Sequence, residues 1–252
     1  MASLSTNKDQ VELQSCARCL LTSSAIYLTI TVAPKSIIDQ FTDVVRRAYG
    51  TRSIGITTSP FTLFTAAQKY FDAEHEHLVM DVGEELTDIA FIKDGFMLYQ
   101  HSFPVGTTEL YRAVAANTKQ TVIQAKALIE THRLGKTTGA AKNGVEKGIV
   151  AFRKTWQKGL REALDNGHFG FCLPEECYMV ADQRFEVIFA ELVANDPFVQ
   201  HHTYCGAVVP HFMSARTLAG KVVTSTRTGI DAPLGVAALF ASTILQDKTL
   251  KQ

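Results

Sequence analysis

The sequence predicts an α/β fold in which helices flank a mixed β-sheet. Strand-like and helix-like segments alternate along most of the chain. Residues 78–103 also contain three apolar runs separated by two short turns, which is typical of a β-meander of two successive hairpins. Together the alternation and the meander favour a mixed sheet with helices packed against it.

Segments before the meander are assigned from periodicity and from helix-end signals. Apolar residues alternate up to Val32, as in a strand, whereas Ile37, Phe41 and Val44 share one stripe of a helix that Gly50 closes. Ser59 is a candidate N-cap for the next helix. In order we expect a strand at 17–32, a helix at 34–50, a short strand at 54–56, a helix at 59–71 and a charged connection at 72–77.

Within and after the meander, the same signals define the remaining elements. Gly95 lies in the second turn, Gly135 ends a helix, and Trp156 lies in a long amphipathic helix. We expect strands at 78–81, 86–92 and 96–103, helices at 107–116 and 121–134, a loop at 136–144, a helix at 145–166, a strand at 176–181, a helix at 183–192 broken at 195–197, a weakly patterned stretch at 199–209, a loop at 228–231 and a final helix at 233–246.

Composition limits the classes of function. The 252 residues carry a formal net charge of zero and 46% hydrophobic residues, which is ordinary for a globular protein. A neutral chain has no general attraction for nucleic acid, so no nucleic-acid partner is expected. No apolar stretch is long enough to span a bilayer, and the N-terminus lacks the apolar core of a secretion signal. We therefore expect a cytoplasmic location.

Metal chemistry gains little support. Cys16 and Cys19 have the spacing of half a zinc site, but the matching half is missing, so buried reduced thiols are the simpler interpretation. The histidine pairs at 75–77 and 201–202 lack further ligands, so no metal site is expected. Six Lys and Arg residues at 136–158 make a locally basic loop and helix. A solvated helix face is a simpler interpretation of them than a surface that binds an acidic partner, lipid or nucleic acid.

The meander carries a family resemblance. Asp81-Val82-Gly83, then Thr87-Asp88-Ile89, then a strand ending Phe103-Pro104-Val105-Gly106, resembles the second phosphate region of actin-like ATPases. It is most similar to the bacterial group that includes the division protein FtsA and the pilus-assembly protein PilM. The resemblance implies an actin-like (ribonuclease H-like) mixed five-stranded sheet. It implies a polar arm at 1–19, a partial preceding α/β subdomain at 20–75 and a second actin-like domain at 76–252.

The same resemblance implies a nucleotide site. Backbone N–H groups of a glycine turn suit a phosphate, and a carboxylate orders Mg²⁺ and water, so ATP and Mg²⁺ would be the cofactors of an active form. Asp81 would then be the catalytic carboxylate. The residues implied to bind nucleotide are Asp81, Gly83, Thr87, Asp88, Gly106 and Thr107. From the residues alone, Asp81 can equally be the polar tip of a hairpin, and Thr87 and Asp88 can simply satisfy turn amides.

The sequence also departs from the family pattern. Glu84 and Glu85 stand where the family has glycine, and two carboxylates beside a triphosphate repel it. The adenosine-binding Gly-Gly turn is replaced by 181–183, and only the alanine of the nucleoside segment matches at 125–129. No first phosphate hairpin is found, and we expect the chain to start too late to hold one.

We therefore expect a non-catalytic actin-like scaffold, with no cofactor, in a bacterial cell-division or pilus-type machine near the inner membrane. It would act through protein partners, and homo-oligomers are compatible with that role. Two alternatives stay open: an ATP-binding ATPase completed by a partner chain, and an unrelated α/β binding module.

Overall fold

The computed structural model describes residues 32–51, 54–71, 76–166, 172–203, 206–222 and 231–249. Residues 17–31 of the predicted strand at 17–32 and residues 228–230 of the loop at 228–231 lie outside these ranges. The elements in chain order are α1 (Lys35–Tyr49), α2 (Ser59–Tyr70), β1 (Glu76–Val82), β2 (Thr87–Lys93), β3 (Phe96–Phe103), α3 (Thr107–Thr118), α4 (Val122–Arg133), α5 (Gly139–Asn166), β4 (Glu176–Val180), α6 (Glu186–Ala194), α7 (Pro197–His202), β5 (Val209–Phe212), α8 (Ala215–Leu218) and α9 (Ala232–Thr249).

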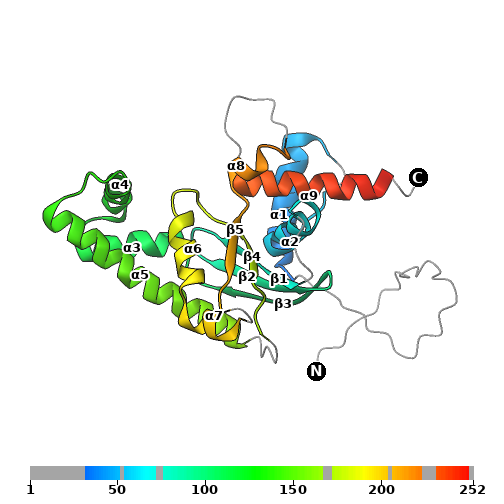
Figure 1. Ribbon diagram of the computed structural model, residues 1–252. Helices are drawn as coiled ribbons and strands as arrows, with labels where there is room; N and C mark the ends of the chain where they lie inside the picture. Colours follow the sequence, from blue (N-terminus) through cyan, green and yellow to red (C-terminus); the bar gives the residue numbers. More distant parts are fainter. Residues whose placement is uncertain are drawn as a thin grey trace, which may run out of the picture.

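The five strands form one mixed sheet in the order β3-β2-β1-β4-β5, which confirms the predicted fold class (Figure 1). β1, β2 and β3 are antiparallel neighbours, as the meander predicted. β4 pairs in parallel with β1, and β5 pairs in parallel with β4. The carboxyl ends of β1 and β4 therefore meet at the same edge of the sheet, where ligands of α/β proteins usually bind.

Each face of the sheet packs against a separate layer of helices. Alternation along β1 sends Leu78 and Met80 to one face and Val79 to the other. The first face is covered by α3, α5 and α6. Trp156, on α5, is completely buried in this layer. The second is covered by α2, α8 and α9. Figure 1 shows the α3–α5 end reaching away from the sheet at the left.

Several sequence-based boundaries need correction. Residues 54–56 are not a strand, because in the described part of the chain no sheet strand pairs with them. The expected loop at 136–144 is partly helical, since α5 begins at Gly139. Gly144 and Gly148 allow that helix to lie against α3, where an added Cβ would meet Thr118 and Val114 at 2.8 and 2.6 Å.

The least patterned stretch contains structure that the sequence did not reveal. The short helix α7 lies across the expected break and the weakly patterned stretch, β5 and α8 lie at or beyond the end of that stretch, where no element was assigned, and β1 begins at Glu76 inside the expected connection. α6 begins at Glu186 rather than 183, after a turn in which the Phe185 N–H donates to the Asp182 carbonyl at 2.8 Å. The subdomain limits at 19 and 75 stay predictions. In the described residues, no helix is both long and apolar enough to cross a membrane.

Candidate functional site

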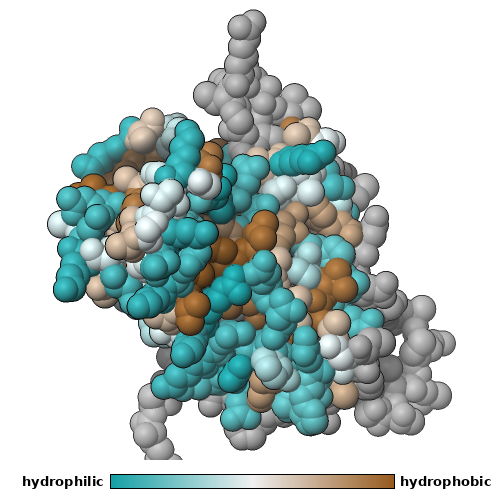
Figure 2. Space-filling view, turned by 60° about the vertical axis from the view of Figure 1, so that its left-hand side comes forward, coloured by the Kyte–Doolittle hydropathy of each residue, from teal (hydrophilic) through white to brown (hydrophobic). Residues whose placement is uncertain are grey.

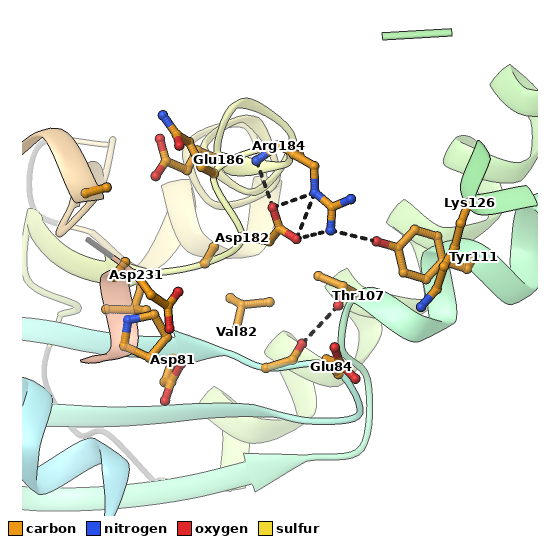
Figure 3. Close-up of a pocket in the computed structure, with 17 residues that line it drawn as sticks. Asp81, Val82, Glu84, Thr107, Tyr111, Lys126, Asp182, Arg184, Glu186 and Asp231 are labelled. Atoms are coloured by element: carbon orange, nitrogen blue, oxygen red, sulfur yellow. Dashed lines mark hydrogen bonds and ion pairs between the residues drawn. The ribbon is translucent and has the colours of Figure 1, made fainter. Parts of the chain in front are cut away.

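A cavity of about 510 Å³ lies at the carboxyl ends of β1 and β4. Its walls come from the β1–β2 turn, the start of α3, Lys126 of α4, the segment from β4 into α6, and the start of α9 (Figure 3). In the space-filling view, a cleft separates the projecting α3–α5 end from the body of the molecule, with apolar side chains at its floor (Figure 2). The cavity thus includes the loop that the sequence associated with phosphate.

The turn after Asp81 is closed by its own backbone. The Gly83 N–H donates to the Leu86 carbonyl at 2.9 Å. This hydrogen bond uses the amide that the family resemblance assigns to phosphate. A ligand oxygen would have to displace the turn's own carbonyl to reach it.

The N-terminus of α3 is occupied in the same way. The Thr107 and Thr108 N–H groups donate to the carbonyls of Gly83 and Glu84 at 3.0 and 2.8 Å. A Cβ added at Gly106 would lie 2.5 Å from both of those carbonyl oxygens, so only glycine allows the two segments to meet. The first amides of a helix ordinarily attract anions, but here the turn satisfies two of them.

Asp81 is the carboxylate at the base of the cavity. It also borders a second cavity of about 230 Å³ between α2 and α9. The Ser59 hydroxyl donates to its carboxylate, and Asp88 lies opposite it on β2. Burial raises the pKa of Asp81, the Ser59 hydrogen bond opposes that rise, and the Asp88 charge adds to it. Ser59 is the first residue of α2 and not its N-cap, as the sequence had suggested, because Thr58 takes that position.

Thr87 and Asp88 are used within the fold. Thr87 is completely buried, donates to the Val105 carbonyl at 2.7 Å and accepts from Trp156 Nε1 at 3.1 Å. Asp88 accepts a hydrogen bond from the Ser102 hydroxyl. Neither residue lines the cavity, whereas Asp81, Gly83 and Thr107 do. Gly106 lies behind the turn and contributes by permitting its approach to α3.

Arg184 links three walls at the opposite end of the cavity. Its guanidinium donates to Asp182 through Nε and to the Tyr111 hydroxyl of α3 at 3.4 Å (Figure 3). It also donates to Glu130 of α4 at 3.1 Å. Hydrogen bonding to Arg184 lowers the pKa of Asp182, and burial raises the pKa of Tyr111. Lys126 Nζ lies 4.7 Å from the centre of the Tyr111 ring. The only sequence feature that could have indicated Arg184 is its spacing two residues after Asp182.

The cavity lining has more acidic than basic side chains. The charged residues that line it are Asp81, Glu84, Asp182, Glu186, Asp231, Lys126 and Arg184. Because Arg184 is already paired with two carboxylates, it adds little to the attraction of a further anion. Acidic walls and occupied amides both disfavour a polyphosphate.

The described residues contain no group of three or more His, Cys, Asp or Glu side chains placed to hold a metal ion. Burial raises the pKa of the Cys177 thiol to about 12, which leaves it protonated and unreactive at neutral pH. His77 is buried beside Tyr178, with ring centres 5.5 Å apart. Cys16, Cys19 and His75 lie outside the described ranges.

Comparison with solved structures identifies an actin-like fold. A PilM–PilN type IV pilus biogenesis complex matches at 14% identity and a TM-score of 0.53 over 83% of this chain. MreB 5 of Spiroplasma citri bound to AMPPNP matches at 11% identity and a TM-score of 0.52 over 86% of this chain. EutJ, an ethanolamine utilization protein from Carboxydothermus hydrogenoformans, matches at 19% identity, with a TM-score of 0.42, over 71% of this chain. The sheet and its flanking helices are those of the actin-like ATPase fold.

The chain spans 54% of the EutJ chain, 58% of the PilM–PilN chain and 67% of the MreB 5 chain. No protein-family model matches the sequence, and no curated protein sequence matches it either. The fold likeness shows that the meander lies in an actin-like sheet, as the resemblance implied.

Proposed function

We propose that this protein is an actin-like scaffold that acts through contacts with other proteins and does not bind ATP tightly by itself. The hydrogen-bond pattern at the phosphate end of the cavity carries the proposal. The amides of Gly83, Thr107 and Thr108 already donate to backbone carbonyls at 2.8–3.0 Å. A triphosphate could gain these donors only by breaking their present hydrogen bonds and leaving the carbonyls without a partner, which offsets the gain.

The electrostatics of the lining support the same conclusion. Figure 3 shows Asp81 and Asp231 near each other at one end of the cavity, whereas Glu84 projects from the turn farther along, below Thr107. Each additional carboxylate near a bound phosphate costs on the order of 1 kcal/mol or more at short range. Asp81 itself is pushed toward its neutral form by burial, which weakens it as a ligand of Mg²⁺.

The second part of the proposal concerns the cellular machine in which this protein works. Among the structures with this fold is a PilM–PilN type IV pilus biogenesis complex, in which an actin-like protein is joined to another protein. We propose a comparable role for this chain in a bacterial pilus or cell-division machine, as a cytoplasmic component held at the inner membrane by a protein partner.

Isothermal titration calorimetry with Mg-ATP tests the loss of nucleotide binding. The expected result is no measurable heat up to millimolar nucleotide, with MreB 5 of Spiroplasma citri, whose structure holds AMPPNP, as the positive control. Binding with a micromolar Kd by this chain alone would overturn the proposal.

A second candidate is an ATPase that a partner chain completes. The observation in its favour is that the cavity persists, with Asp81 at its base and a volume of about 510 Å³. Repeating the titration with proteins encoded beside this chain distinguishes the two. Nucleotide binding that appears only with a partner, and disappears with Asp81→Ala, supports the second candidate.

A further inference from the structure

Helix α4, which forms one wall of the cavity, packs on the protein through a small part of its surface. Of its twelve residues only Ala125 and Ile129 are buried, and both belong to the core that α3 and α5 share with the sheet. Ile123, in the first turn, is 81% exposed. The start of the helix is stabilised from within, because Thr121 and Gln124 cap it reciprocally. Two buried side chains are therefore the main packing contact that holds α4 in place.

Short connectors at 119–121 and 134–138 join α4 to α3 and α5. Lys119 has a φ of 56°, in the left-handed region that residues with a side chain seldom adopt. At the other connector, Gly135 and Gly139 have φ values of 70° and 55°, and an added Cβ at either would meet nothing within 4 Å. Hinges in proteins are typically a few residues at the ends of elements, where backbone rotation is absorbed. Both connectors have this placement.

Arg184 fastens α4 to the other side of the cavity. Its Nη1 donates to Glu130 Oε1 at 3.1 Å, while its Nε is held by Asp182. Within the described residues, the bond to Glu130 is the only hydrogen bond between α4 and the segment that leads from β4 into α6. The two side chains are 45% and 32% exposed, so water competes for this ion pair and it contributes little to stability. Lys126, one turn before Glu130, lines the cavity, so the position of this wall depends on a weak bond.

From the small packing contact, the two connectors and the weak bond, we propose that α4 is a lid of the cavity, which the Glu130–Arg184 pair latches and which opens by rotation about the connectors. Opening moves Lys126, whose Nζ lies 4.7 Å from the centre of the Tyr111 ring, away from the cavity and widens the cleft seen in Figure 2. A ligand that binds the open state better than the closed state increases its population. The inference does not depend on the proposed function, because a lid controls the access of any ligand, nucleotide or not.

Single-molecule energy transfer between dyes at Ile123 and Leu234 of the full chain tests the lid. Leu234 is 69% exposed at the start of α9, and α4 and the start of α9 border the cavity on different sides (Figure 3). The dyes are attached through p-acetylphenylalanine, which leaves the native cysteines unmodified. We expect a main population with a short separation and a minor one with a longer separation. Glu130→Ala should increase the minor population roughly three- to fivefold, as expected for the loss of an exposed ion pair.

Glu146→Ala is the matched control, because it removes a surface ion pair with Lys142, 3.8 Å away within α5, and should leave both populations unchanged. Raising NaCl to about 0.5 M should increase the open population of the wild type but not of Glu130→Ala, since salt screens the latch. Circular dichroism and the urea midpoint establish that both variants fold. Identical populations in the wild type and Glu130→Ala would overturn the proposal, and so would an equal change in Glu146→Ala.

Discussion

Trp156 Nε1 donates a hydrogen bond to the Thr87 hydroxyl at 3.1 Å, deep in the core. The same hydroxyl donates onward to the Val105 carbonyl at 2.7 Å. This chain of two bonds joins helix α5, strand β2 and the segment that leads into α3. A residue expected to contact nucleotide therefore holds together the elements that shape the cavity.

Replacing Thr87 by Val should destabilise the fold. Valine has nearly the same shape but leaves the Trp156 N–H and the Val105 carbonyl without a partner. Each buried unsatisfied group costs about 1–3 kcal/mol, so we expect a loss of roughly 2–4 kcal/mol in the free energy of unfolding. This loss is measured by urea unfolding, with the fluorescence of the single tryptophan as the signal. Thr87→Ser keeps the hydroxyl and should cost clearly less; equal losses for the two variants would contradict the hydrogen-bond explanation.

Gly106→Ala should disrupt the contact between the β1–β2 turn and α3. The added Cβ would lie 2.5 Å from the carbonyl oxygens of Gly83 and Glu84, and backbone atoms cannot move aside as a flexible side chain would. We expect a loss of about 2 kcal/mol or more. Gly220→Ala is the control, since nothing lies within 4 Å of its added Cβ. If Gly106→Ala unfolds at the same urea concentration as the wild type, the close approach is not required.

The raised pKa of Asp81 gives a pH-dependent prediction. In the pH window between the ordinary pKa of 3.8 and the raised pKa of folded Asp81, the folded protein keeps this proton while the unfolded chain has already lost it. The folded state therefore binds more protons in this window, and the contribution of Asp81 to stability falls as the pH rises through it. Asp81→Asn cannot ionise and can still accept from Ser59. Its stability relative to the wild type should increase with pH across the window and then level off.

Denaturant unfolding of both proteins at a series of pH values measures this difference. Ser59→Ala provides an independent check, because loss of its hydrogen bond raises the pKa of Asp81 further and extends the window upward. A difference between Asp81→Asn and the wild type that is independent of pH would show that Asp81 titrates normally.

Much of the fold follows from local sequence signals. The meander was predictable because β1, β2 and β3 are joined by short turns and their register depends on neighbouring residues alone. Thr121 caps α4 with a reciprocal bond to Gln124, a local feature that marks the helix start. β5 was missed because its four residues are a strand only through pairing with β4, more than thirty residues earlier.

The site was less predictable than the fold. The sequence places Asp81 and Gly83 in one turn, and that turn lines the cavity, whereas their role in nucleotide binding stays a prediction. Tyr111 and Arg184 were missed because 73 residues separate them and only the packing of α3 against the end of β4 brings them together. Thr87 was misplaced because alternation in a strand does not show which face lies toward a cavity.

Under the proposed function, the double variant Glu84→Gln with Glu85→Gln tests whether the charges of the turn or its occupied backbone amides would prevent ATP binding. Removing both charges relieves the repulsion, but the Thr107 and Thr108 amides remain bonded to the carbonyls of Gly83 and Glu84. The lost ion pair between Glu85 and Arg112, 3.1 Å apart on the surface, is worth about 0–1 kcal/mol, so the variant should fold normally. We therefore expect calorimetry with Mg-ATP to detect no binding by the variant either. Micromolar binding by the variant alone would show that charge, and not the occupied backbone, is what excludes the nucleotide.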